Sequence, residues 1–252
     1  MGAKDWMVVY AEGEVRPVLQ AGPALDREAT LALVQRLHPG QAVTALGDCS
    51  LAQGNPPDGV VHAGCFPGLA VVCTGEVALD EPSRLHPRFL AEGHGRTTYL
   101  HAMHSVVDWC ALAVWAPDGV LVRALSLSPD DGIIENTGAP LPFEEPYWAG
   151  ERAVDEDEDD DEDEDEDEEP YPLPFHPLEL ASDALRHFLG FEYEGMQLPD
   201  DPDPEQVPLV AYRVGPAAAP ASGTAGARRG VGSLLSGRLA SLLRRASRRP
   251  RS

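Results

Sequence analysis

Lysine is nearly absent from this chain, which has Lys4 and no other lysine among its 252 residues. Acidic residues outnumber lysine and arginine together by 42 to 19, so the formal net charge is −23. A surface with this excess of carboxylates repels the phosphate groups of nucleic acids. The composition therefore argues against nucleic-acid binding by the acidic body of the chain and leaves only its arginine-rich end for that role.

Cysteines and long apolar runs are also scarce. The chain has four cysteines and no secretory signal in its first residues, so we expect free thiols. The longest uncharged run, 59–75, is interrupted by glycines and is shorter than the roughly 20 apolar residues of a membrane span. Trp6 stands where a myristoylation signal needs serine or threonine. These absences predict a soluble, cytoplasmic protein.

Known catalytic motifs are missing as well. The sequence contains no glycine-rich phosphate loop, no dinucleotide-binding fingerprint and no nucleophile elbow. The leading hypothesis is therefore a non-enzymatic interaction or regulatory module inside the cell, with a protein of unknown identity as its partner. Neither a substrate nor an oligomeric state follows from the sequence.

Charge divides the chain into three parts. Every residue from 155 to 169 is Asp or Glu, while the last part contains eight arginines, from Arg228 to Arg251, and no acidic residue. Segments with one sign of charge and few apolar residues bury too little surface to offset their chain entropy. We therefore expect a disordered acidic insert at 155–169 and a disordered arginine-rich tail at 214–252. Residues 1–154 and 170–213 are expected to form a single α+β domain.

The hydrophobic pattern of this domain predicts one mostly antiparallel or mixed sheet with two or three helices. Short apolar and β-branched runs bounded by Gly or Pro predict strands at 6–11, 42–46, 60–66, 69–74, 96–101, 106–115 and 120–127. Apolar residues at helical spacing predict helices at 26–37, 87–91 and 178–189. We expect Asp26 to cap the first helix, Gly190 to end the last, and 128–148 to be an ordered surface loop.

Five blocks of the sequence are distinctive: MGAKDWM, GCFPG, YLHAMHSVVDW, RALSLSPDDGIIENTGAPLPFEEPYWAG and PLPFHPLEL. A chain with these blocks in this order resembles a family of uncharacterised actinobacterial proteins. The resemblance covers most of residues 1–195, apart from the acidic insert. It implies a soluble domain, and it supplies no activity or catalytic residue that can be transferred to this chain.

Two pairs of residues have the spacing of metal ligands, namely His62 with Cys65 and His101 with His104. Imidazole and thiolate groups are typical ligands of four-coordinate zinc, the one cofactor that this residue set suggests. Residues three apart on a strand point to opposite faces, however. The alternative is therefore a domain without a cofactor, in which these histidines are partly buried and hydrogen-bonded.

The same region suggests a second enzymatic hypothesis, a small metal-dependent or thiol-type hydrolase. In its thiol version, Cys65 is the nucleophile, His101 or His104 is the base, and Asp108 orients the base. No local motif marks such a nucleophile, and any chain with several His and Cys residues contains a comparable triple. The hypothesis requires that these groups converge in space.

Polar and aromatic residues gather in the predicted loop 128–148, and loops held by a rigid scaffold often bind ligands. We expect any ligand groove between this loop and the segment 99–109. The candidate binding residues there are His101, His104, Asp108, Glu135, Asn136, Glu144 and Trp148. The alternative is that Asn136 serves turn geometry and that Trp148 covers the core.

The tail has a basic amphipathic pattern between residues 231 and 247. Its apolar residues recur at helical spacing, and arginines surround them. Gly232 and Gly237 oppose a stable helix by about 1 kcal/mol each relative to alanine. We expect a disordered tail with transient helicity, whose candidate partners are an anionic membrane surface or nucleic acid.

Overall fold

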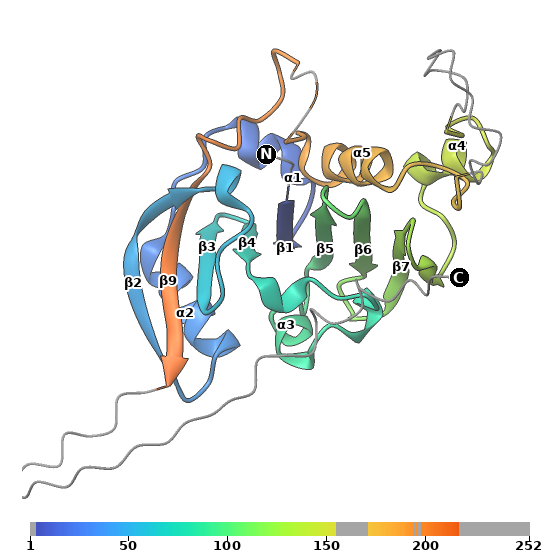
Figure 1. Ribbon diagram of the computed structural model, residues 1–252. Helices are drawn as coiled ribbons and strands as arrows, with labels where there is room; N and C mark the ends of the chain where they lie inside the picture. Colours follow the sequence, from blue (N-terminus) through green and yellow to red (C-terminus); the bar gives the residue numbers. More distant parts are fainter. Residues whose placement is uncertain (1–3, 155–170, 194, 196–197, 217–252) are drawn as a thin grey trace, which may run out of the picture. The chain divides into compact units, whose positions relative to one another are not determined.

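The computed structural model describes residues 4–154, 171–193, 195 and 198–216 (Figure 1). The predicted acidic insert at 155–169 and the predicted tail helix at 231–247 lie outside the described residues. None of the described helices is long and apolar enough to cross a membrane.

Within the described residues, nine strands form a single sheet in the order β2-β9-β3-β4-β1-β5-β6-β7-β8. Every neighbouring pair is antiparallel. The strands are β1 Lys4–Ala11, β2 Gln41–Ser50, β3 Val60–Phe66, β4 Leu69–Cys73, β5 Thr97–His104, β6 Trp109–Trp115, β7 Leu121–Ser128, β8 Gly132–Thr137 and β9 Pro208–Pro216. The first strand, β1, thus lies at the centre of the sheet.

Helices cover both faces of this sheet. They are α1 Val15–Gln20, α2 Arg27–Leu37, α3 Pro87–Glu92, α4 Glu145–Trp148 and α5 Pro177–Leu189. On one face, Leu185 of α5 belongs to the same hydrophobic cluster as Val9 of β1. On the other face, Leu33 of α2 and Phe89 of α3 belong to a cluster that contains Val8. Neighbouring residues of β1 therefore enter two different cores.

This double coverage explains the continuous apolar runs of the central strands. A strand with both faces buried needs no alternation between apolar and polar residues. All residues of β4 and of β6 are buried, and their sequences, LAVVC and WCALAVW, contain no charged residue.

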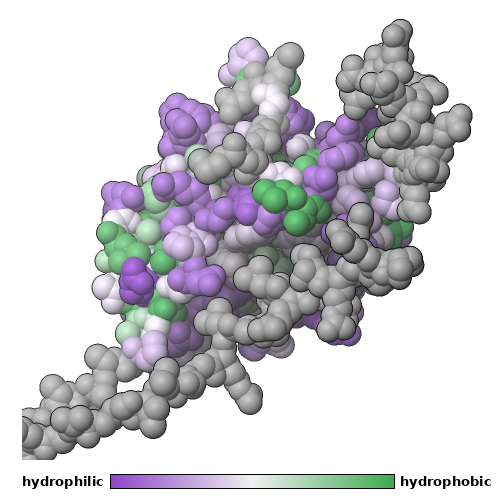
Figure 2. All heavy atoms as spheres, viewed as in Figure 1, coloured by the Kyte–Doolittle hydropathy of each residue, from purple (hydrophilic) through white to green (hydrophobic). Residues whose placement is uncertain are grey.

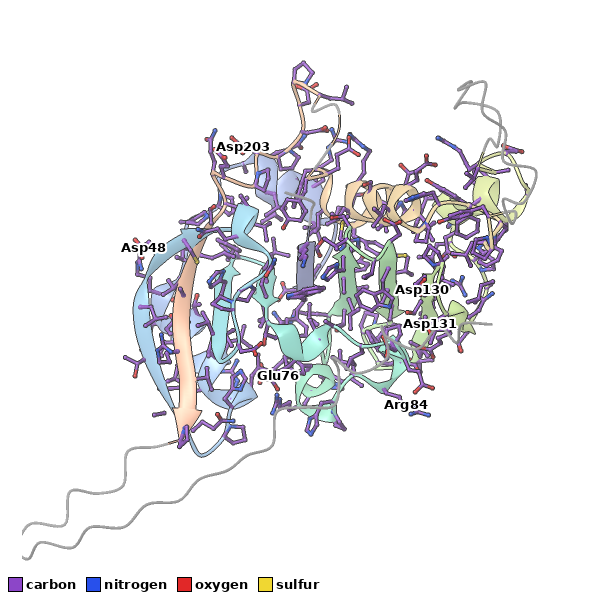
Figure 3. The ribbon with its side chains drawn as sticks, in the orientation of Figure 1. Asp48, Glu76, Arg84, Asp130, Asp131 and Asp203 are labelled. Carbon is purple, nitrogen blue, oxygen red and sulfur yellow. The ribbon has the colours of Figure 1, made fainter. Side chains whose placement is uncertain are left out.

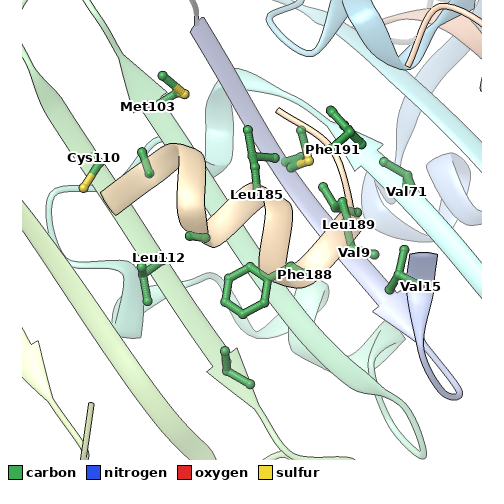
Figure 4. Packing of buried hydrophobic residues seen from close by; sticks show 14 of the residues in the cluster. Val9, Val15, Val71, Met103, Cys110, Leu112, Leu185, Phe188, Leu189 and Phe191 are labelled. Carbon is green, nitrogen blue, oxygen red and sulfur yellow. The ribbon is translucent and has the colours of Figure 1, made fainter. Parts of the chain in front are cut away.

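Helix α5 belongs to the part of the chain that follows residues 155–170, and it packs onto the core that residues 4–154 form. Leu185 and Phe188 lie in one hydrophobic cluster with Val9 (Figure 4). Gly190 ends the helix with a φ of 85°, a left-handed conformation that favours glycine. The segments on both sides of 155–170 therefore contribute to one core, and β9 contributes to the same sheet.

The three predicted helices are confirmed, each with a shift of one residue at one end. The Asp26 side chain accepts a hydrogen bond from the Ala29 backbone N–H at 2.9 Å, so it caps α2 as its position before the apolar repeat indicates. Helix α1 was not predicted, because its six residues include Pro17 and are too few for a helical repeat.

The domain contains more β structure than the α+β prediction implies, because two strands were not predicted. Strand β8 lies inside the expected loop 128–148, and as an edge strand that pairs only with β7 it has few buried apolar residues. Strand β9 begins at Pro208 and ends at Pro216, which favours a loop locally. Its pairing with both β2 and β3 overrides that preference.

The predicted strand 106–115 is wrong in its first three residues. Val106 and Val107 have β-branched side chains that favour a strand, yet they lie in the turn between β5 and β6. The Val107 backbone N–H donates to the His104 carbonyl at 3.2 Å, and Asp108 adopts a left-handed conformation with a φ of 46°. These two features reverse the chain before β6 begins.

Candidate functional site

The four predicted zinc ligands do not converge. His62 and His101 lie on the face that α5 covers, and strands β4 and β1 separate them by roughly 14 Å. Cys65 packs into the cluster on the opposite face, where the ring of His104 lies 5.9 Å from that of Trp6. No three His, Cys, Asp or Glu side chains of the described residues form a group that could hold a metal ion.

Cys65 is also poorly placed for the thiol-type mechanism. Its backbone N–H donates to Thr30 Oγ1, and its carbonyl accepts from the Asp26 N–H, both at 2.9 Å. Burial raises the pKa of the thiol, so it is protonated at neutral pH and a weak nucleophile. His101 lies on the other face of the sheet, and Asp108 lies in the β5–β6 turn. The structure does not bring the proposed nucleophile, base and orienting group together.

His101 has a buried carboxylate as its partner. Its Nδ1 lies 2.7 Å from Asp5 Oδ1, and its Nε2 lies 2.9 Å from the Ala181 carbonyl oxygen. Because a carbonyl only accepts, Nε2 must carry a hydrogen. The contact between Nδ1 and Oδ1 then holds one further proton, so Asp5 and His101 together are neutral. Burial raises the pKa of Asp5, and His101 opposes that rise.

Three of the predicted loop residues meet at one buried arginine. Arg123 donates from Nε and Nη2 to the Glu144 carboxylate, at 2.9 and 2.6 Å, and from Nη1 to Asn136 Oδ1 at 2.7 Å. Trp148 Nε1 donates to the same carboxylate at 3.2 Å. The Arg123 and Glu144 side chains are fully buried. These contacts hold the loop that follows β8 against the sheet. They occupy the Glu144 carboxylate inside the core, whereas Asn136 is exposed and Trp148 is half-buried.

Glu135 points away from this network. Its Oε2 accepts a hydrogen bond from the Ser83 backbone N–H at 3.0 Å, on the opposite face of β8. Sequence reasoning missed Arg123 itself. One arginine inside the otherwise uncharged run LVRALSLS is a usable signal, because a buried guanidinium requires a carboxylate partner from elsewhere in the chain.

The remaining two candidates, His104 and Asp108, flank the turn between β5 and β6. His104 organises this turn, because its Nδ1 accepts from the Val106 N–H at 3.3 Å and its carbonyl accepts from the Val107 N–H. Asp108 is the one non-glycine residue with a positive φ among the described residues. This conformation is uncommon for a residue with a side chain, and aspartate tolerates it better than most.

The β5–β6 turn exposes two adjacent valines, and aromatic rings pack together beside the turn. Val106 is 72% exposed and Val107 is 49% exposed. The ring centroid of Trp6 lies 5.9 Å from that of His104 and 6.4 Å from that of Trp109. Figure 2 shows hydrophobic residues in small groups on a largely hydrophilic face. The turn is therefore an apolar projection with a rigid support.

The titratable rings beside the turn, those of His104 and Tyr171, are uncharged at neutral pH. Burial and, secondly, Lys4 lower the pKa of His104, so its ring is neutral at pH 7. Burial and, secondly, Asp108 raise the pKa of Tyr171 to about 12. Three buried polar atoms near the turn have no hydrogen-bond partner among the described residues: Ser105 Oγ, Trp109 Nε1 and Tyr171 Oη. Asp108 directly follows Val107 in the turn, and Lys4 is the β1 partner of His104, so one charge of each sign lies beside the two valines.

Two cavities that the sequence did not indicate are lined by a mixture of charged, polar and apolar residues. One of about 750 Å³ lies between α1 and the loop 199–207, and one of about 430 Å³ lies along α5. Carboxylates in both already have partners, since Asp201 accepts from Arg16 and Arg186, and Asp183 accepts from Tyr147 at 2.7 Å. Among the described residues that line them, no hydrogen bond joins a hydroxyl such as that of Ser182 to a basic side chain.

Apart from Asp130 and Asp131, which are neighbours in the β7–β8 turn, the charged side chains labelled in Figure 3 belong to different elements, and they do not point toward a common centre. Several of them are paired locally, as Asp48 is with Arg27 at 2.7 Å and Arg84 is with Glu81 at 2.6 Å. The strongly acidic composition is therefore spread over the described surface and is not concentrated in one binding site.

A family model described as a family of unknown function, DUF6928, matches residues 5–212. The chain belongs to this family. The match runs from β1 into β9, so the DUF6928 domain includes the segments on both sides of 155–170. No curated protein and no solved structure matches the chain. The resemblance to an uncharacterised family is confirmed, and the argument for a function has to come from the geometry of the domain.

Proposed function

We propose that this DUF6928 domain is a protein-interaction module and that the β5–β6 turn is its contact site. The observation that carries the proposal is the pair of adjacent exposed valines, Val106 and Val107, in a turn whose flanking residues His104 and Trp109 pack their rings against that of Trp6. Exposed apolar groups that are contiguous and rigidly supported are typical of interaction sites.

The turn is held in place before any partner arrives. Strand β5 pairs with β1 along its whole length and with β6 on its other side. The hydrogen bonds from the Val106 and Val107 N–H groups to His104 fix the backbone of the tip. A partner that binds this tip therefore has little additional chain to order. Little of the free energy gained by burying the valines is then lost as conformational entropy.

The size of the apolar contact is sufficient for a hot spot. Full burial of a valine side chain stabilises by about 1.5 to 3 kcal/mol. The exposed areas of Val106 and Val107 together amount to slightly more than that of one fully exposed valine residue. A partner that covers both would gain roughly 2 to 3 kcal/mol from them, which is typical of a central interface residue.

A protein partner suits this turn better than nucleic acid or an anionic membrane. The net charge of −23 repels phosphate groups at long range, whereas the two valines fit an apolar pocket on another protein. The arginine-rich tail remains a separate, sequence-based candidate for contacts with anionic surfaces, and its predicted helix lies outside the described residues.

The proposal is tested by charging the tip. The full chain, wild type and with Val106→Asp and Val107→Asp combined, is used to capture partners from its native cell. Each captured protein is then purified, and its affinity is measured by calorimetry. We expect the double variant to bind the partner at least roughly 30-fold more weakly, because the burial energy of two valines is lost.

Val120→Asp is the matched control, because Val120 is 60% exposed and precedes β7, away from the β5–β6 turn. We expect this variant to keep wild-type affinity and all variants to keep the wild-type circular dichroism spectrum. Equal affinity of the double variant and the wild type for every captured partner would overturn the proposal.

A further inference from the structure

His38 is a buried histidine whose ring makes no hydrogen bond with any described residue. It directly follows α2, and its side chain is 1% exposed. Both Nδ1 and Nε2 are without a hydrogen-bond partner among the described residues. Because buried polar groups are nearly always satisfied, a ring in this position points to a function or to a conformational change.

Charged groups from two other elements face this ring. Glu76, in the short 3-10 turn Gly75–Val77, has its Oε1 3.5 Å from His38 Nδ1, and its Oε2 accepts from Arg88 of α3. Arg36 of α2 pairs with Glu92 of α3 at 2.8 Å and fixes the two helices together nearby. The Glu76 carboxylate is thus shared between His38 and a guanidinium.

The buried position is suited to a neutral ring only. Burial and, secondly, the Arg88 guanidinium lower the pKa of His38 to about 4. A histidine in water has a pKa of about 6.5. The buried position of the His38 ring is therefore most stable above pH 6.5. It becomes progressively less stable as the pH falls from 6.5 toward 4, because in that range a His38 ring exposed to water gains a proton and the buried ring does not.

We propose that His38 is an acid-sensitive trigger that releases the end of α2 from the turn Gly75–Val77 and from α3. Inside the contact, an imidazolium would lie beside Arg88 and would compete with it for Glu76. Outside, the ring gains hydrogen bonds to water, and its positive charge is favourable at the C-terminal end of a helix. The trigger lies outside the β5–β6 turn and does not depend on the function proposed for it.

The size of the effect follows from the two pKa values. For a ring with a pKa of about 4 when buried and about 6.5 when released, lowering the pH from 7 to 5 raises the ratio of released to buried forms roughly 20-fold. A change of this size is measurable by hydrogen exchange even when the released form is a minor population.

Hydrogen–deuterium exchange of the full chain at pH 7 and pH 5, corrected for the intrinsic rate at each pH, tests the trigger. In the wild type we expect peptides that cover 33–41, 74–78 and 86–92 to lose roughly 20-fold in protection at pH 5. His38→Phe removes the titrating group and is expected to give the same protection at both pH values. His62→Phe is the matched control, because His62 is buried but has the Gln53 carbonyl oxygen 2.8 Å from its Nδ1.

The control should keep the wild-type response in the three peptides. Equal losses in the wild type and His38→Phe, or no loss in the wild type, would overturn the proposal. Because His38→Phe could fail to fold, the His38 ring is also titrated by NMR in the wild-type chain. A midpoint near pH 4 to 5 supports the trigger, and a midpoint above pH 6 overturns it.

Discussion

Asp5 and His101 illustrate how hydrogen-bond geometry sets the charge of a buried pair. The Ala181 carbonyl requires a hydrogen on His101 Nε2, and the remaining proton lies between Nδ1 and Asp5. The pair is therefore neutral as a unit, and its burial costs less than the burial of two unpaired charges. A neutral group that donates one hydrogen bond to Nδ1 should be able to replace the carboxyl group.

This argument predicts different effects for two substitutions of Asp5. Asp5→Asn keeps a donor for His101 Nδ1 and should lower the free energy of unfolding by about 1 kcal/mol or less. Asp5→Ala leaves Nδ1 of the neutral ring without a partner in the core and should cost about 1 to 3 kcal/mol. Urea denaturation of both variants measures the difference. If Asp5→Asn is as destabilising as Asp5→Ala, the pair is a true ion pair and the neutral substitute is inadequate.

At the scale of elements, the β5–β6 turn depends on the left-handed conformation of Asp108. A β-branched residue is strained at a φ of 46°, whereas glycine is not. We expect Asp108→Val to lower the free energy of unfolding by about 1 to 2 kcal/mol and Asp108→Gly to leave it within about 1 kcal/mol of the wild type. Thermal unfolding of both variants checks this, and equal destabilisation by glycine would show that the Asp108 side chain, not its backbone, holds the turn.

The sequence predicted the helices whose ends carry a marker, that is, a residue typical of a helix cap. Asp26 before α2 and Gly190 after α5 are such markers, and both helices are where they were expected. Strands β8 and β9 lack them. The former is a short edge strand, and the latter is defined by pairing with β2 and β3, which are distant in the sequence. Non-local pairing of this kind has no local pattern to reveal it.

The candidate site was predictable only in part, for a similar reason. His104 and Asp108 were selected for their chemistry, and they do flank the turn. Val106 and Val107 were assigned to a strand, because β-branched residues favour strands and the left-handed residue that reverses the chain is not a glycine. Because the sequence did not show where the turn begins, it also did not show that these two valines are exposed.

At the scale of the whole molecule, the order of the strands in the sheet differs from their order in the chain. Strand β9, the last, lies between β2 and β3, so β2 has no other partner strand in the described part of the chain. Helix α5 covers the face formed by the first part of the chain, with Leu185 and Phe188 in its core. Residues 171–216 are therefore integral to the fold that residues 4–154 begin.

This arrangement predicts that cutting the chain between 155 and 169 leaves the two pieces associated. A site for a specific protease is inserted between Asp160 and Asp161, and the cleaved protein is examined by size-exclusion chromatography and thermal unfolding. We expect one peak that contains both pieces, because separating them would expose the apolar face of α5 and unpair both edges of β9. We also expect a single unfolding transition at a lower temperature than in the uncut chain, because cleavage makes association bimolecular. The same site inserted after Pro216 is the control and should leave the transition unchanged. Two separately eluting, folded pieces would mean that the acidic segment links two domains and that the shared core is not needed for the stability of either.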